Sequence, residues 1–178
     1  DVHIVSIERQ HIPMNAAVNR RRKGWHIDPA RLRLSYGVYM APNFKETHHE
    51  SAYLLRFVDA QNEVRAVLWS YACHPTSFPE KELVSADYPG VVRMDMRSFI
   101  GNNIPVVFLQ GMAGDKRAPE LGGEISFKGR IRRSIGGPHF GSFNMGAYQK
   151  WAQSLSNHVL DSFVDRQKWI KIRPEFSS

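Results

Sequence analysis

Two apolar segments joined by a short polar connection constrain the fold of this chain more than any other feature. Residues 51–58 and 64–72 are rich in aliphatic and aromatic side chains, and residues 59–63 between them have the length of a hairpin connection. We therefore expect two adjacent antiparallel strands. The second segment starts with alternating residues and becomes continuously apolar, which is typical of a strand buried on both faces near its end. Cys73 and His74 follow at the carboxyl end of that strand.

Other hydrophobic patterns predict a further strand, two helices and a strand at the beginning of the chain. Residues 105–109 are a short apolar run, and the glycines of residues 111–115 permit a tight turn after it. Residues 89–100 and 145–165 carry apolar side chains at helical spacing. Residues 1–7 read as a strand already under way. We expect an α/β fold of the mixed α+β kind, with a mixed β-sheet or paired sheets covered by helices and a site on loops at strand ends.

Two long segments, residues 8–50 and 116–143, show no sustained hydrophobic period, and we expect both to be long loops. In a compact domain, loops of that length are usually functional or disordered, which indicates an elaborated site. The chain has 178 residues, is 42% hydrophobic and contains no internal repeat, which suits one domain with a buried core. We interpret residues 1–178 as a single unit without an internal boundary. The first residues lack the layout of a signal peptide and read as a mature or truncated N-terminus.

The charge balance and the single cysteine restrict the classes of function. Lys and Arg outnumber Asp and Glu by 24 to 17, a net charge of +7, but much of the excess lies in residues 20–23 and 128–133. We interpret both stretches as solvated loops. No nucleic-acid module and no regular basic face is visible, so no nucleic acid is expected. Cys73 alone can form neither an internal disulfide nor a multi-thiolate metal site, and no apolar run reaches the length of about 18 residues that a membrane-spanning helix needs.

His74 leaves a buried strand and precedes a proline, at the kind of strand end where sheets place ligands. A zinc site would need such a neutral imidazole and an open position where bound water falls to a pKa of about 7. The spacing by itself favours a buried structural histidine over a ligand, because the chain contains no His-x-His, His-Glu-x-x-His or Cys-x-x-Cys pattern. The adjacent His48 and His49 are interpreted as a surface pair.

Four short blocks occur in a fixed order along the chain. They are residues 18–21 (Val-Asn-Arg-Arg), 72–77 (Ala-Cys-His-Pro-Thr-Ser), 83–90 (Leu-Val-Ser-Ala-Asp-Tyr-Pro-Gly) and 107–115 (Val-Phe-Leu-Gln-Gly-Met-Ala-Gly-Asp). Together, over roughly residues 15–119, they resemble blocks of the neutral/alkaline non-lysosomal ceramidase family, and the shared order is more specific than any single block. The resemblance implies the interior portion of a ceramidase-like catalytic domain, incomplete in this chain. It also implies zinc-dependent hydrolysis of an amide bond in a ceramide-like or other N-acyl substrate.

The resemblance carries functional roles over to individual positions. His74 matches a zinc-binding histidine of the family. Asp87 matches an acidic residue that we expect to orient a ligand or the loops of the site, and a helix-start cap is an equal alternative.

Two further pairs of residues match the family's active-site region. Asn19 and Arg20 match a pair near the substrate, where a guanidinium could hold an oxyanion or a carboxylate. The alternative for this pair is an exposed basic loop. Gly114 and Asp115 match a Gly-Asp pair on the active-site loop, and an ordinary turn is the alternative there.

One departure from the family affects the chemistry directly. Where the family's Gly-Asp pair is followed by a catalytic serine, this chain has Arg117, preceded by Lys116. Arginine stays protonated and cannot act as nucleophile or general base. Attack by zinc-bound water is therefore the expected route, with Arg117 or Lys116 stabilising the oxyanion or binding an acidic group of the substrate. A basic, exposed loop is the alternative.

The second departure is the number of zinc ligands. The family completes its zinc site with another histidine, expected before this chain begins, and with a glutamate and a tyrosine, expected after it ends. We therefore expect the chain alone to be inactive unless remaining parts of the same protein complete the site. The alternative function is a non-catalytic binding protein with a degenerate ceramidase-like site. The family suggests an extracellular or periplasmic location, and a lipid substrate makes peripheral membrane contact possible.

Overall fold

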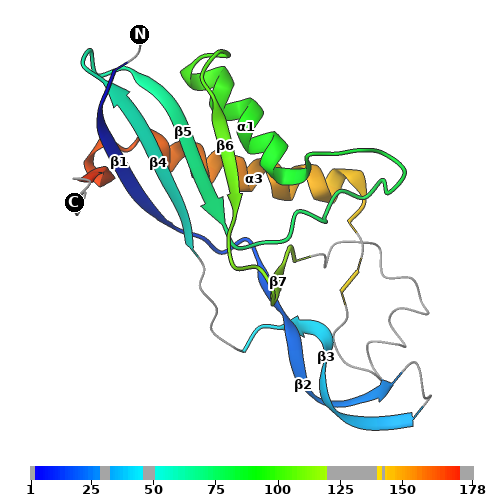
Figure 1. Ribbon diagram of the computed structural model, residues 1–178. Helices are drawn as coiled ribbons and strands as arrows, with labels where there is room; N and C mark the ends of the chain where they lie inside the picture. Colours follow the sequence, from blue (N-terminus) through cyan, green and yellow to red (C-terminus); the bar gives the residue numbers. More distant parts are fainter. Residues whose placement is uncertain (1–2, 29–32, 46–50, 120–139, 142, 173–178) are drawn as a thin grey trace.

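The computed structural model describes residues 3–28, 33–45, 51–119, 140–141 and 143–172. Within these residues the chain forms two sheets and two α-helices (Figure 1). In chain order the elements are β1 (Ile4–Pro13), β2 (Val18–Asp28), β3 (Arg33–Asn43), β4 (Ser51–Asp59), β5 (Val64–Tyr71), α1 (Asp87–Ile100), β6 (Val106–Gln110), β7 (Lys116–Arg117), α3 (Met145–Val164), the 3-10 helix η1 (Arg166–Lys168) and β8 (Ile170–Ile172).

The larger sheet has the strand order β6-β5-β4-β1-β8, and α1 and α3 lie against one of its faces (Figure 1). Neighbouring strands are antiparallel except for β5 and β6, which are parallel. A parallel pair requires a crossover connection, and here that connection contains α1. The mixed α+β fold, the antiparallel pair of β4 and β5, the strand β6 and both helices confirm the predictions made from hydrophobic spacing.

Asp59 shapes the turn between β4 and β5. Its carboxylate accepts the backbone N–H groups of Gln61 and Glu63, each at 2.9 Å, and Nε of Arg65 at 2.5 Å. Asn62 has a φ of 64°, in the left-handed region that asparagine tolerates. The Glu63 N–H is the largest of the causes that hold the pKa of Asp59 below its usual value, and the Arg65 guanidinium adds to it. The polar connection therefore supplies its own hydrogen bonds.

The core lies between the larger sheet and the two helices, directly behind the end of β5. Trp69 on β5 contacts Tyr88 on α1 and Phe108 on β6, with ring centroids 6.1 and 4.6 Å away. Trp151 on α3 closes the cluster, with its ring centroid 5.4 Å from that of Tyr88. Complete burial of a large apolar side chain contributes about 1.5–3 kcal/mol, so this cluster gives the carboxyl end of β5 a rigid support.

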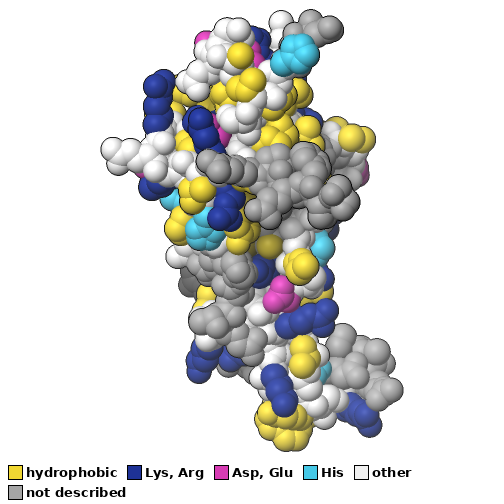
Figure 2. All heavy atoms as spheres, turned by 60° about the vertical axis from the view of Figure 1, so that its left-hand side comes forward, with side chains coloured by type: hydrophobic (Ala, Val, Ile, Leu, Met, Phe, Trp, Pro, Cys, Tyr) yellow, Lys and Arg dark blue, Asp and Glu magenta, His cyan; other side chains and the backbone are white. Residues whose placement is uncertain are grey.

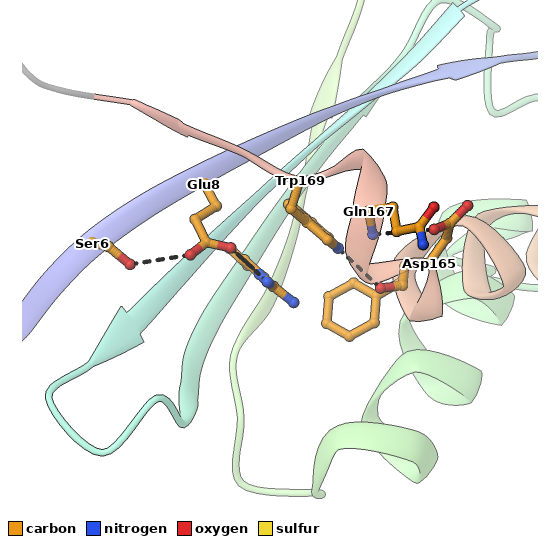
Figure 3. Close-up of polar contacts among 7 residues, drawn as sticks. Ser6, Glu8, Asp165, Gln167 and Trp169 are labelled. Atoms are coloured by element: carbon orange, nitrogen blue, oxygen red, sulfur yellow. Dashed lines mark hydrogen bonds and ion pairs between the residues drawn. The ribbon is translucent and has the colours of Figure 1, made fainter.

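A largely buried ion pair joins Glu8 on β1 to Arg56 on β4, and Trp169 from the C-terminal part of the chain packs on it (Figure 3). Glu8 accepts from Nε of Arg56 at 2.7 Å and pairs with its Nη2 at 2.5 Å, and Ser6 Oγ donates to Glu8 at 3.4 Å. The same guanidinium lies 4.3 Å from the centroid of the Trp169 ring. Trp169 Nε1 in turn donates to the Phe163 carbonyl at 3.1 Å. Because the pair is shielded from water, loss of either partner leaves a buried charge.

The smaller sheet shows that the prediction of one long loop over residues 8–50 was wrong. β1 continues to Pro13, and β2 and β3 form a long antiparallel ribbon in a sheet of order β3-β2-β7. The basic residues at 20–23 and the paired Gly24 and Gly37 weaken the strand signal, but the large apolar residues at 34, 36, 38 and 40 alternate as in a strand, and the prediction overlooked them. The basic stretch 20–23 therefore belongs to a strand and not to a loop.

The second predicted loop, residues 116–143, lies only partly within the described residues. Its first two residues form β7, which pairs with the start of β2. The basic stretch 128–133 and the histidine pair at 48–49 fall outside the described residues. In the part of the chain that the structure describes, no helix is long and apolar enough to cross a membrane.

Candidate functional site

His74 lies just beyond β5, where its backbone is held from two sides. On one side, the Tyr88 hydroxyl donates to the carbonyl of the preceding residue, Cys73, at 2.7 Å. On the other side, the His74 N–H meets the Lys116 carbonyl at 3.4 Å, and His74 pairs with Arg117 in an isolated parallel bridge. The aromatic core and the segment after β6 thus fix the position of this histidine.

A glycine, Gly111, follows the last residue of β6 because the backbone comes very close to the end of β5 there. The Gly111 N–H donates to the Tyr71 carbonyl at 3.1 Å. A Cβ atom on Gly111 would lie 2.9 Å from the backbone nitrogen of Ala72, closer than real Cβ atoms come. Gln110 Nε2 adds a hydrogen bond to the Cys73 carbonyl at 3.1 Å. This close contact keeps the residues that follow the two strands together.

Asp87 is buried, and its carboxylate binds the backbone of the segment that follows β5. Oδ2 accepts the N–H groups of Ser77 and Phe78 at 2.5 and 3.0 Å, and Oδ1 accepts the Tyr88 N–H at 2.6 Å. Asp87 itself has a φ of 51°, in the left-handed region. Burial raises the pKa of Tyr148, and the charge of Asp87 and a hydrogen bond to it raise that pKa further. The bonds to Ser77 and Phe78 suit the expected loop-orienting role, and the bond to the Tyr88 N–H at the start of α1 suits the alternative of a helix-start cap, so the geometry is compatible with both.

Asn19 and Arg20 at the start of β2 clamp the turn before β7. The Arg20 N–H donates to the Asp115 carbonyl at 2.7 Å, and its Nε and Nη2 both donate to the Gly114 carbonyl, at 3.1 and 2.9 Å. Asn19 Nδ2 meets Asp115 Oδ2 at 3.5 Å, and its Oδ1 accepts the Arg21 N–H at 2.7 Å. A Cβ atom on Gly114 would meet no heavy atom within 4 Å, so the clamp uses the carbonyl of Gly114 and not its lack of a side chain.

Arg117 and Lys116 form β7 beside this clamp. Val18 pairs with Arg117 and Asn19 with Lys116. The Arg117 guanidinium carbon lies 4.7 Å from the centroid of the Phe140 ring, within the range of a cation–π contact. The half-buried Arg117 therefore occupies an ordered place next to His74 and is not part of a freely solvated basic loop.

Three causes lower the pKa of His74. Desolvation by burial is the largest, and the positive charges of Arg20 and Arg117 follow. All three disfavour the protonated imidazolium, so near neutral pH the ring is uncharged and a nitrogen lone pair is available. A neutral imidazole is the form of histidine that binds a metal ion or acts as a base.

The structure brings most of the predicted site residues together at the ends of β2, β5 and β6. Those that gather there are Asn19, Arg20, His74, Gly114, Asp115 and Arg117. Asp87 reaches the same region through the backbone it holds. Sequence reasoning missed Tyr88 and Gln110, which fix the Cys73 carbonyl, and their place inside two of the quoted blocks is the signal that could have found them.

The described residues do not form a complete metal site. Among them, no group of three or more His, Cys, Asp or Glu side chains could hold a metal ion. The neutral imidazole of His74 suits one zinc ligand, but the guanidinium groups of Arg20 and Arg117 repel a cation. Asp87 uses its oxygens on backbone N–H groups. These residues therefore fit zinc as one contributor to a site and not as a whole site.

The fold is similar to that of part of two solved ceramidase structures. The structure of neutral ceramidase from Pseudomonas aeruginosa matches with a TM-score of 0.56 at 15% sequence identity, over 93% of this chain and 23% of that chain. A structure of ceramidase complexed with C2 matches with a TM-score of 0.57 at the same identity and coverage. No family model matches the chain, and no curated protein sequence matches it.

At 15% identity the likeness concerns the fold. It confirms the expected ceramidase-like architecture as a partial and divergent resemblance. The chain spans about a quarter of the length of the ceramidase structures it matches, at 23%.

Proposed function

We propose that residues 1–178 are the interior portion of one ceramidase-like catalytic domain, and that the whole protein hydrolyses an amide bond in a small-molecule or lipid N-acyl substrate. The observation that best supports this proposal is that His74, which pairs with Arg117 in a parallel bridge, lies beside the turn at Gly114–Asp115 that Arg20 clamps. Strand ends are common places for ligands, and here segments far apart in the sequence converge on one.

His74 is assigned as one zinc ligand. Its lowered pKa keeps the imidazole neutral, which is the form that metals bind. The family resemblance implies that the other ligands come from remaining parts of the same protein, and the described residues among themselves offer no group of three. A zinc ion, when bound, polarises a carbonyl oxygen and lowers the pKa of bound water.

The charged residues around His74 suit amide hydrolysis, in which the carbonyl oxygen becomes negative before the amine leaves. Arg20 directs two of its donors at the Gly114 carbonyl, so it is a positioning residue for the Gly114–Asp115 turn. Asp115 is held in turn by Asn19. Arg117 is the residue assigned to the developing oxyanion or to an acidic group of the substrate, since it cannot take the place of a serine nucleophile. Water is then the nucleophile, and a carboxylic acid and an amine are the products.

The face of the larger sheet opposite the helices is apolar and exposed, which suggests that further parts of the protein cover it. This face exposes Tyr53, Val107, Leu109 and Ile170, each between 45 and 57%. Such a face is normally covered by another layer. The matched ceramidase chain is several times longer than this chain, and the match covers only 23% of it. We infer that other parts of the same protein cover this face and complete the site.

Release of amine from an N-acyl substrate by the complete protein tests the proposal. His74→Ala is expected to reduce kcat/KM by about 100-fold or more. The control His3→Ala, at an exposed position just before β1 and at the opposite end of the larger sheet from His74, is expected to leave kcat/KM unchanged. Arg117→Ala is expected to lower kcat by about 100-fold, with partial rescue by Arg117→Lys. Full activity of His74→Ala would exclude the assigned role.

A non-catalytic binding protein is the second candidate. The presence of Arg117 where the family has a serine, and its ordered contact with Phe140, favour it. This candidate predicts that the complete protein binds an N-acyl ligand at a site sensitive to Arg117→Ala but releases no amine. Calorimetric titration next to the turnover assay separates the two.

A further inference from the structure

The ribbon of β2 and β3 exposes apolar side chains in a row. Figure 1 shows the ribbon extending away from the larger sheet and the helices, and Figure 2 shows hydrophobic and basic side chains together at that end of the molecule. The large hydrophobic side chains involved are 59 to 66% exposed and comprise Trp25, Ile27, Leu34, Tyr36, Val38 and Met40.

These apolar side chains share one face of the ribbon. Successive residues of a strand point to opposite faces, and the register places Trp25 opposite Tyr36 and Ile27 opposite Leu34. The rings of Trp25 and Tyr36 meet edge to face, with centroids 5.4 Å apart. Exposure alternates along both strands, so the residues between them are half-buried on the other face.

Two basic residues continue the same face toward the base of the ribbon. Lys23 lies opposite Val38, and Arg21 lies opposite Met40. Both are exposed, and Lys23 Nζ is 6.0 Å from the centroid of the Tyr36 ring. The face is therefore apolar and aromatic at its outer end and basic nearer the rest of the molecule.

The other face of the ribbon is already packed in part. The His26 ring stacks on the Tyr39 ring with centroids 4.6 Å apart, next to the Gly24 and Gly37 pair. Within the described residues, a third strand joins the ribbon only at Val18–Asn19, through β7. A two-stranded ribbon is only marginally stable in water, so covering its apolar face would stabilise it.

We propose that this face of the β2–β3 ribbon docks on an anionic lipid surface, lying flat in the interface between water and hydrocarbon. Trp and Tyr are the side chains that concentrate at the headgroup level, because each has an apolar body and a polar group. Lys23 and Arg21 complement anionic headgroups beside them. The other occupants that such a face could take, a second copy of the chain or another part of the same chain, are outcomes of the test below. The proposal is independent of any hydrolytic activity of the His74 site.

Cosedimentation of the complete protein with phosphatidylcholine vesicles, with and without phosphatidylglycerol, tests the proposal. Trp25→Ser combined with Tyr36→Ser is expected to weaken vesicle binding by about ten-fold or more. Arg21→Gln and Lys23→Gln are each expected to weaken binding to the anionic vesicles by about five-fold, and to the neutral vesicles hardly at all. Leu83→Ser combined with Val84→Ser removes comparable exposed apolar side chains elsewhere and should change nothing.

Two control measurements distinguish a loss of vesicle binding from a folding defect. Trp25→Phe should retain most of the binding, and the thermal midpoint of every variant should match that of the unchanged protein. Absence of binding to anionic vesicles, or binding that the ribbon variants leave intact, would overturn the proposal. So would a concentration-dependent dimer that Trp25→Ser abolishes, because the face would then cover a second copy. Protection of Trp25 from a soluble quencher in the vesicle-free complete protein would also overturn it, since another part of the chain would occupy the face.

Discussion

Asp87→Asn is expected to loosen the segment that follows β5 without unfolding the core. The carboxylate accepts three backbone N–H groups, from Ser77 at 2.5 Å, Phe78 at 3.0 Å and Tyr88 at 2.6 Å. A hydrogen bond to a charged group contributes about 1.5–3 kcal/mol, against about 1 kcal/mol for a neutral one. The amide has one oxygen, so its NH2 group must also face at least one N–H donor. Asparagine tolerates the φ of 51°, so the substitution adds no backbone strain.

These losses amount to about 2–4 kcal/mol for local opening, allowing for their lack of additivity. Amide hydrogen exchange at Ser77 and Phe78 measures that opening directly. The expected increase in exchange rate is about 30-fold to 700-fold, since every 1.4 kcal/mol is a factor of ten. The segment in question begins three residues after His74, so its opening also removes support from the site.

Asp95→Asn is the matched control, because it is the same substitution on the same helix. Asp95 accepts Nε2 of Gln153 at 2.8 Å and Oγ of Ser156 at 2.7 Å, both from α3. It is expected to weaken the packing of α1 on α3 and to leave exchange at Ser77 and Phe78 unchanged. Equal exchange at these two amides in Asp87→Asn and in the unchanged protein would refute the loop-orienting role.

Three further predictions concern stability, measured by urea unfolding. Gly111→Ala should lower the free energy of unfolding by about 1–3 kcal/mol, because the new Cβ would overlap the backbone at the end of β5. The control Gly114→Ala should change it by no more than about 0.5 kcal/mol, and equal losses in the two variants would contradict the geometry. Arg56→Met should cost about 3–5 kcal/mol by leaving the Glu8 charge buried alone, and a cost below about 1 kcal/mol would mean that water screens the pair. Folding lowers the pKa of Asp59 below its usual value of 3.8. The Asp59 carboxylate therefore stabilises the folded state fully above pH 3.8, and this stabilisation is lost as the pH falls through the lowered pKa. Asp59→Asn should therefore destabilise at neutral pH and have little effect in strong acid, and a cost independent of pH would count against this.

The elements that border the core could be predicted from the sequence because an element with one buried face has apolar residues at regular spacing. β4 and β5 carry this pattern as two apolar segments around a polar turn, and α3 carries it as apolar steps of three and four. β3 also carries an alternating pattern, with large apolar side chains at residues 34, 36, 38 and 40, and the prediction of a loop overlooked it. In β2 the basic residues at 20–23 and Gly24 obscure the strand signal. What the sequence pattern does not show is that this apolar face is exposed.

The site could be predicted only as a set of residues, and not as a geometry. The ordered blocks place His74 and Asp115 near each other, but the hydrogen bonds of Arg20 to Gly114 join positions 94 residues apart. Whether Asp87 faces a ligand or its own backbone depends on the path of residues 77–78, which no spacing rule specifies. The identity of Arg117 was visible from the sequence, whereas its place beside Phe140 required the fold.

The zinc content of the complete, metal-replete protein decides whether His74 binds the metal. We expect about one zinc ion per chain in the unchanged protein and in His3→Ala, and loss of that ion in a folded His74→Ala variant. Near-ultraviolet circular dichroism of the three proteins establishes that the fold is kept. A fully folded unchanged protein without zinc, or a zinc content that His74→Ala leaves intact, would contradict the assignment of His74 as a ligand.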